Sequence, residues 1–161
     1  MEIRKTRPGD LVRVMEIYEY ARGFMKESGN PNQWKDSFPP QEMIERDIKT
    51  GQSYVVQSGE ELLGVFAFII GEDPSYKVIE QGGWKNEEPY GTIHRIAGTG
   101  KGKGVFACCM DFCKRQMDNL RIDTHHDNKI MQHLIEKHGF EKCGIIHVED
   151  GSARIAYQWT K

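Results

Sequence analysis

A strand pattern that runs directly into four closely spaced glycines constrains the fold of this chain more than any other feature. The alternating apolar run from Thr92 to Ala97 ends in glycines at positions 98, 100, 102 and 104, with a lysine on each side of the third. A helical pattern begins immediately afterwards. Strand, glycine turn and helix in this order gather free backbone N–H groups and the positive end of a helix dipole at one spot. Because glycine lets the backbone approach an anion closely, we expect a phosphate or pyrophosphate site here.

The spacing of these glycines excludes two familiar phosphate-binding loops. A P-loop reads Gly-x-x-x-x-Gly-Lys followed by Ser or Thr, but Ala97 stands at its first glycine and Gly104 at its hydroxyl position. A dinucleotide-binding loop reads Gly-x-Gly-x-x-Gly, and Lys103 or Val105 stands where its last glycine is required. An unrelated nucleotide-phosphate site is therefore disfavoured. A flexible turn with solvated lysines is the other alternative, but alternating glycines at four positions exceed what a turn needs.

Two segments match the motifs of a known superfamily. Lys101 to Phe106 reads Lys-Gly-Lys-Gly-Val-Phe, and Asn128 to Phe140 ends in Glu-Lys-His-Gly-Phe. The first segment resembles the acetyl-CoA-binding motif of the GNAT superfamily of N-acetyltransferases: Arg or Gln, two residues, Gly, one residue, then Gly or Ala. Here a lysine replaces the Arg or Gln, and Phe106 replaces the final small residue. The second segment resembles the superfamily's Asn, short helix and Tyr-Glu-Lys-x-Gly-Phe, with Ile135 at the tyrosine position.

The resemblance implies an acyltransferase with acetyl-CoA as its co-substrate. In the GNAT fold the strand before the glycine loop and the next strand splay apart, here 90–97 and 120–124, and the pantetheine arm pairs with strand backbone in the gap. The pyrophosphate would rest on N–H groups of the glycine loop. In the family, Asn128 would reach the pantetheine or the thiolate, and a helix N-cap explains it equally well. The implied cofactor contacts are Ile96, Ala97, Lys101, Gly102, Lys103, Gly104, Val105, Phe106 and Asn128.

The implied reaction is direct attack of a primary amine on the thioester, which needs a base for the amine and a donor for the departing thiolate. A family tyrosine at the position of Ile135 usually protonates the thiolate, and isoleucine cannot do so. Two alternatives follow. Either another acid or a water molecule protonates the thiolate, or the chain is a noncatalytic acyl-CoA-binding or regulatory domain. The acceptor is a small-molecule or peptide amine whose identity the sequence does not determine.

Three residues are candidates for proton transfer. His94 lies on the strand before the glycine loop, and its imidazole can titrate near neutral pH. Strand alternation places it on the same face as Thr92 and Ile96, and a hydrogen-bonded structural role is the alternative. Tyr90, at the start of this strand, could donate to a thiolate or contact substrate. His138 follows the missing tyrosine by one helical turn, and it could instead offset the dipole at a helix C-terminus.

Three aromatic residues fall in predicted loops that flank the acceptor cleft in this fold. They are Trp34, Phe38 and Trp84. An aromatic wall would suit a flat or cationic acceptor, and ordinary loop packing is the alternative for each residue.

The remaining patterns predict one domain spanning residues 1–161. Together with the resemblance, they predict an α/β (mixed α+β) fold: a central, mostly antiparallel twisted sheet with a splayed parallel strand pair and helices on both faces. A short strand is also expected near Tyr76 to Glu80. The predicted strands are 2–6, 53–58, 62–70, 90–97, 120–124, 141–149 and 153–159, and the predicted helices are 10–29, 40–50, 104–118 and 128–137.

Composition narrows the compartment and the partners. A net charge of -2 and an isoelectric point near 6.3 argue against broad nucleic-acid binding. We expect a cytoplasmic protein without a membrane partner, because the first residues lack a signal peptide's apolar region and the apolar stretch Leu62–Ile70 is too short to span a bilayer. Homodimer formation is left open. Cys109 and Cys113 could join His125 or His126 in a metal site, but without a Cys-x-x-Cys pair we expect none.

Overall fold

The chain folds around one seven-stranded sheet with the strand order β1-β2-β3-β4-β5-β7-β6. The computed structural model describes residues 1–161. No helix is long and apolar enough to cross a membrane. The strands are β1 (Glu2–Lys5), β2 (Ser53–Ser58), β3 (Glu61–Ile70), β4 (Gly91–Gly98), β5 (Asn119–Thr124), β6 (Glu141–His147) and β7 (Ala153–Thr160), and the helices are α1 (Leu11–Glu27), α2 (Gln41–Lys49), α3 (Val105–Gln116) and α4 (Lys129–Lys137), with short 3-10 turns η1 (Pro8–Asp10) and η2 (Pro74–Tyr76).

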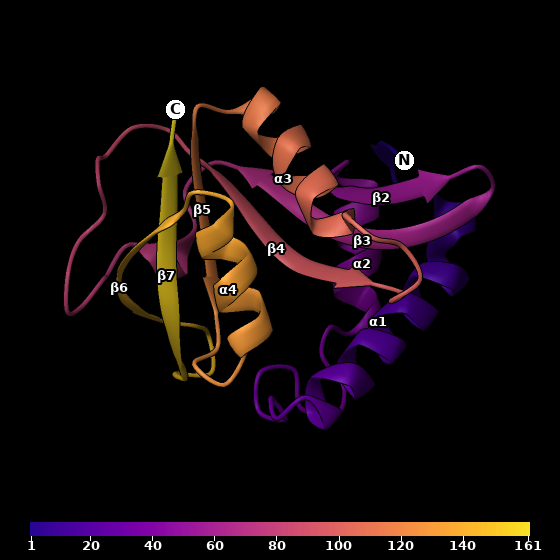
Figure 1. Cartoon of the computed structure of the whole chain (residues 1–161), viewed down its shortest axis with the longest axis horizontal. Coiled ribbons are helices and arrows are strands. Elements are labelled where there is room, and N and C mark those ends of the chain that lie inside the picture. The colour runs from indigo at the N-terminus through magenta and orange to yellow at the C-terminus, as the bar shows by residue number, and fades with distance from the viewer.

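Helices cover both faces of the sheet, as the sequence predicts (Figure 1). Strand alternation sends neighbouring residues into two different apolar cores. On β2, Val55 packs in the core beneath α1 and α2, whereas Val56 packs in the core beneath α3 and α4. The latter core includes Ile135 of α4, whose side chain has no exposed surface. An aromatic side chain at position 135 would therefore have to displace packed neighbours.

The parallel strands β4 and β5 separate soon after they begin. They pair only at Gly91 with Leu120 and at Thr92 with Arg121. From Ile93 onward β4 has no pairing partner on the β5 side, and the two strands diverge (Figure 1). All other neighbouring strands pair antiparallel. The predicted fold class, including the splayed parallel pair, is confirmed.

A β-bulge interrupts β4 and changes which of its residues share a face, so the predicted faces are wrong beyond the bulge. Arg95 and Ile96 together lie opposite the single residue Phe66 of β3, and Arg95 has a φ of 51°. The extra residue shifts the alternation by one position. Ile96 therefore does not share a face with His94 as predicted, but packs with Ile93 against the core beneath α3 and α4.

Two helices hold this bulge in place. The guanidinium of Arg95 donates two hydrogen bonds, both 2.9 Å long, to the carboxylate of Asp47 on α2. The hydroxyl of Tyr18 on α1 donates to the backbone carbonyl of Arg95 at 2.8 Å. Tyr18 and Asp47 are both buried. Burial raises the pKa of Tyr18, so its hydroxyl stays protonated as a donor.

The predicted short strand near Tyr76 is wrong. Residues Pro74–Tyr76 form the 3-10 turn η2 instead, begun by Asp73, whose carboxylate accepts from the Ser75 N–H at 2.9 Å. A proline at the first position and an acidic residue before it favour such a turn over a strand. Of the predicted strand only a single bridge remains, between Glu80 and β6.

We predict that Tyr18→Phe lowers the free energy of unfolding by about 1–2 kcal/mol, because the bulge carbonyl of Arg95 loses its donor while the packed ring is kept. Chemical denaturation measures this change. Tyr20→Phe on the same helix is the matched control, since the Tyr20 side chain is half exposed and makes no hydrogen bond in the structure. Equal effects of the two substitutions would show that the Tyr18 hydroxyl does not stabilise the bulge.

Candidate functional site

The glycine loop leaves a run of backbone N–H groups unused. From Gly102 to Ala107, none of these groups donates a hydrogen bond within the chain. They surround the first turn of α3, which begins after Gly104, a residue with a φ of 78°. The predicted pyrophosphate contacts Lys101 to Phe106 all lie on this loop and helix start. Concentrated free donors at a helix N-terminus are the feature that anions require.

Two glycines of the loop are needed for steric reasons. A Cβ on Gly100 would lie 2.7 Å from the Tyr20 hydroxyl, and Gly100 also has a φ of 77°. Gly104 has open space around it but a left-handed backbone, which strains any residue with a Cβ. The lysines are exposed, and Lys101 Nζ lies 3.7 Å from the carboxylate of Glu61, an exposed pair that contributes little to stability.

A cleft of about 1070 Å³ opens beside the gap between β4 and β5. The α1–α2 loop, the segment after β3, the two diverging strands, the start of α4 and the β6–β7 turn all line it. Five of the predicted site residues are among the lining residues. They are His94, Ile96, Asn128, Trp34 and Phe38.

His94 forms a hydrogen-bonded pair with Asp73 at the floor of this cleft. Its Nε2 lies 2.8 Å from Oδ2 of Asp73. Burial disfavours the ionised carboxyl of Asp73, but the hydrogen bond and charge of His94 and the Ser75 N–H outweigh burial and hold the pKa of Asp73 below its usual value. Asp73 cannot be identified from the sequence, because only the fold brings the segment after β3 against β4.

A second pair, also missed, joins Tyr76 and Asp123. The Tyr76 hydroxyl donates to Oδ2 of Asp123 at 2.6 Å, and the Tyr76 ring centroid lies 6.3 Å from that of His94. Burial and the neighbouring carboxylate raise the pKa of Tyr76 well above its usual value, so the phenol is a permanent donor at neutral pH. Asp123 sits on β5, and strand periodicity alone gave no signal for a functional carboxylate there.

Asn128 caps α4 and also reaches across the cleft. Its Oδ1 accepts a hydrogen bond from the Met131 N–H at 3.0 Å, as an N-cap does. Its Nδ2 donates to the Gln33 side chain at 3.0 Å. The N-cap interpretation is confirmed, while contact with pantetheine stays a prediction.

Several predicted residues do not line the cleft. The Tyr90 hydroxyl accepts a hydrogen bond from the Asp73 N–H at 2.8 Å, and Arg121 lies over the rings of both Tyr90 and Trp84 at 3.9 and 4.0 Å. Trp84 donates to the backbone carbonyl of Tyr76 at 2.9 Å. These contacts place Tyr90 and Trp84 in a buried cluster behind the cleft floor, so a direct role in proton transfer or in the acceptor wall is not supported. Ala97 likewise packs in the core beneath α1 and α2.

His138 also lies outside the cleft. It follows α4, its ring centroid is 5.2 Å from that of Phe106, and its carbonyl accepts a hydrogen bond from Lys114. Burial and the charge of Lys114 lower the pKa of His138. This position fits packing between α3 and α4 better than substitution for the missing tyrosine.

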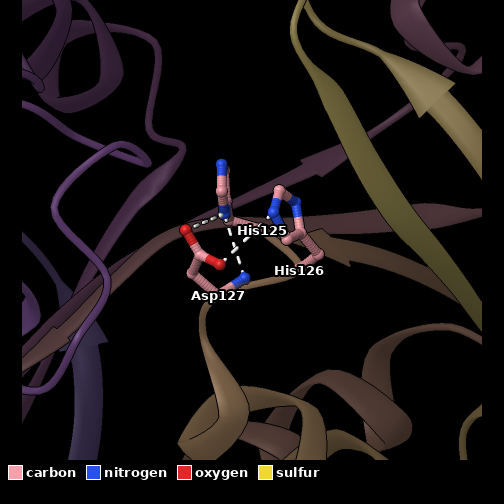
Figure 2. Close-up of side chains that lie close together, drawn as sticks. All are labelled: His125, His126 and Asp127. Atoms are coloured by element: carbon pink, nitrogen blue, oxygen red, sulfur yellow. Dashed lines mark hydrogen bonds and ion pairs between the residues drawn. The ribbon is translucent and has the colours of Figure 1, made fainter.

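Consecutive residues His125, His126 and Asp127 form a tight polar group between β5 and α4 (Figure 2). The Asp127 N–H donates to Nδ1 of His125 at 3.0 Å, so this ring nitrogen takes part in the local turn. Burial and nearby cations lower the pKa of His125, in keeping with a neutral acceptor. Cys109 and Cys113 lie elsewhere, in the core beneath α3. We therefore assign the group to the turn that leads into Asn128.

Several solved structures are similar to this chain over nearly its whole length. A GNAT-family acetyltransferase from Streptococcus agalactiae matches with 29% identity and a TM-score of 0.90, covering 99% of this chain and 95% of that one. A putative acetyltransferase from Staphylococcus aureus matches with 26% identity and a TM-score of 0.71, covering 99% of each chain. An aminoglycoside acetyltransferase solved with coenzyme A and kanamycin shares the fold, at 17% identity and a TM-score of 0.66, covering 99% of this chain and 94% of that one.

No family model and no curated protein sequence matches the chain. The structural neighbours nevertheless agree with the features described above. The free N–H groups at the start of α3, the early separation of β4 from β5 and these similarities together show that the chain belongs to the GNAT superfamily of acetyltransferases.

Proposed function

We propose that this protein transfers an acetyl group from acetyl-CoA to a primary amine. Acyl-CoA-dependent acetyl transfer in general is supported by the structural neighbours, one of which was solved with coenzyme A. The observation that carries the proposal is the pairing of His94 with Asp73 in a cleft that opens on the gap between β4 and β5. A base for the amine and a place for the thioester thus lie side by side.

The residues around the gap fit acyl-CoA. Free N–H groups from Gly102 to Ala107 suit its pyrophosphate, and the unpaired edge of β4 from Ile93 onward suits the amides of pantetheine, including contacts at Ile96 and Ala97. When bound, acetyl-CoA supplies an activated carbonyl. The protein's contribution is to hold that carbonyl beside the acceptor amine and to manage the protons.

His94 takes a proton from the acceptor. An ionised Asp73 can only accept hydrogen bonds, so Nε2 of His94 carries the proton between them and Nδ1 is left free as the base. An alkylammonium that gives one proton to Nδ1 becomes a neutral amine with a free lone pair. During transfer the C–N bond forms, the C–S bond breaks, and the second amine proton leaves by way of solvent while the sulfur departs as the thiol or thiolate.

Thr124 offers a hydroxyl that can take the place of the missing tyrosine as a hydrogen-bond donor. It lies at the end of β5, its side chain is fully buried, and its Oγ1 has no hydrogen-bond partner although the residue lines the cleft. Ile135 lies in the core and offers no donor. We assign to the Thr124 hydroxyl a hydrogen bond that stabilises the developing thiolate.

A noncatalytic acyl-CoA-binding domain is the second candidate, favoured by the buried isoleucine at the usual position of the acid. Release of free thiol from acetyl-CoA over a panel of primary amines separates the two. Binding without thiol release for any amine would favour the noncatalytic domain.

The first prediction from this proposal concerns the glycine loop. Gly104→Ala should abolish most of the rise in melting temperature that acetyl-CoA produces, because the new Cβ and the strained backbone move the N–H groups that hold the pyrophosphate. Gly59→Ala, in the β2–β3 turn, is the matched control, since Gly59 also has a positive φ and open surroundings. Thermal shift with acetyl-CoA, and with ATP and NAD for comparison, measures the effect. Retention of the full shift by Gly104→Ala would place the cofactor elsewhere.

The second prediction concerns the base. His94→Ala should lower kcat by about 100-fold while the thermal shift with acetyl-CoA is kept, since cofactor contacts on β4 use backbone. Asp73→Asn should also lower kcat, by about 10-fold, because the lost negative charge no longer stabilises the imidazolium that forms when His94 takes the proton. An unchanged kcat in both variants would remove His94 from the mechanism.

The third prediction concerns Thr124. Thr124→Val should lower kcat by about 10-fold with little change in stability, because its hydroxyl has no partner in the fold to lose. Thr92→Val is the matched control: Thr92 is also buried with an unpartnered hydroxyl, but it does not line the cleft. Steady-state kinetics with saturating acetyl-CoA measures both. Equal kcat values for the two variants would exclude Thr124 as the donor.

A further inference from the structure

The cleft contains one recessed carboxylate without a positive partner. Of the acidic residues that line it, Asp73 is paired with His94, and Asp150 lies 3.6 Å from Lys35. Glu149 has no ion pair but is exposed at the rim. Asp123 is half-buried on β5 and takes part in no ion pair within the chain. The charge of Arg154 acts on Asp123 without a direct contact. A bound cation that contacts the partly desolvated carboxylate would offset more of the cost of its burial.

We propose that Asp123 binds the ammonium group of the acceptor, and that the acceptor is a small cationic amine with an apolar or aromatic body. The inference rests on the proposed function for its turnover, but the binding it describes does not require transfer to occur.

Tyr76 prepares Asp123 for this task. Its hydroxyl occupies Oδ2 at 2.6 Å, whereas Oδ1 of Asp123 makes no hydrogen bond. Because Tyr76 is buried and stays protonated, it can orient the carboxylate but cannot neutralise its charge. One carboxylate oxygen is thus fixed and the other is left for a ligand with N–H donors.

Asp123 lies on the acceptor side of the sheet. On β5, Ile122 packs in the core beneath α3 and α4, so alternation turns Asp123 to the opposite face, where Tyr76 and His94 lie. Two strands that diverge around the thioester gap thus each contribute one group, a carboxylate from β5 and a base from β4. An ammonium held by Asp123 lies near the imidazole that takes its proton.

The cation nearest in the cleft wall is already engaged. Arg154 is buried and donates to the Ser152 hydroxyl and to the carbonyls of Ala153 and Gln33, but not to Asp123. These three bonds hold the guanidinium against the loops that bound the cleft, and none of them reaches Asp123, so the carboxylate stays open to the N–H donors of a ligand.

The same loops limit the size of the acceptor. Gln33 accepts a hydrogen bond from Asn128 and its carbonyl accepts one from Arg154, while Lys35 lies beside Asp150. These links tie the α1–α2 loop to α4 and to the β6–β7 turn across the cleft. Trp34 and Phe38 of the tied loop, with ring centroids 6.2 Å apart, line the cleft as an apolar wall. A small amine fits this arrangement better than the amino terminus of a folded protein.

The test compares benzylammonium with benzyl alcohol, an uncharged analogue of similar shape, by isothermal titration calorimetry. The full-length protein is saturated with free coenzyme A, so that no acyl transfer can occur. We expect benzylammonium to bind at least about 10-fold more tightly than benzyl alcohol, and Asp123→Asn to remove this difference, because the isosteric amide keeps an acceptor for Tyr76 but loses the charge. Glu149→Gln removes the other unpaired carboxylate of the cleft. In this variant the ratio of the two affinities should stay within about 3-fold of the parent value.

Two results would overturn the assignment. Equal binding of benzylammonium and benzyl alcohol to the parent protein would show that the cleft does not select a cation. Equal losses of the preference for benzylammonium in Asp123→Asn and Glu149→Gln would show that the general negative charge of the cleft attracts the cation, and that Asp123 does not form a specific site. A thermal shift of Asp123→Asn by acetyl-CoA, equal to that of the parent, verifies that the variant is folded. Ammonium binding through Asp123 without any acetylated product would uphold the site while refuting the proposed transfer.

Discussion

The bulge at Arg95 is the constraint on which the site depends. β4 pairs with β3 along its length, diverges from β5 and directs His94 into the cleft. One extra residue in the strand makes these three features compatible. A left-handed conformation at a residue with a side chain costs about 1–3 kcal/mol and persists only when its surroundings fix it. Here Tyr18 of α1 and Asp47 of α2 do so from the same face. The two N-terminal helices therefore position the strand that carries His94 as well as covering the sheet.

The two faces of β4 and β5 carry side chains of different chemistry. Residues directed toward α3 and α4, such as Ile93, Ile96 and Ile122, are apolar and pack in that core. Groups directed the other way, His94 and Asp123, are polar and line the cleft with their partners. Because β4 and β5 separate between these two faces, a thioester lying in the gap would meet the apolar layer along its length and the titratable groups only at its reactive end. Such a division would protect the thioester from water while leaving its carbonyl accessible.

Local patterns in the sequence predict the loop before α3 and the order of the elements, because glycine spacing and strand periodicity depend on neighbouring residues. They do not predict positions that depend on distant contacts. Alternation placed Ile96 on the wrong face because a bulge cannot be read from apolar spacing, and Asp73 acquires its role only when a loop folds back onto β4. Trp84 is the opposite case. Its place in a loop predicts a contact with the acceptor, but in the structure it packs against Tyr76.

The charges of the cleft suggest why two carboxylates accompany one histidine. An ammonium bound by Asp123 would be harder to deprotonate than one in water, so a carboxylate that binds the acceptor would also oppose its activation. Asp73 would compensate, because it would stabilise the imidazolium formed when His94 takes the proton. The proton would then move from a nitrogen facing Asp123 to Nδ1 of an imidazole whose Nε2 is held by Asp73, and the net charge of the cluster would stay the same. Transfer without charge separation is the arrangement that a half-buried, low-dielectric site opposes least.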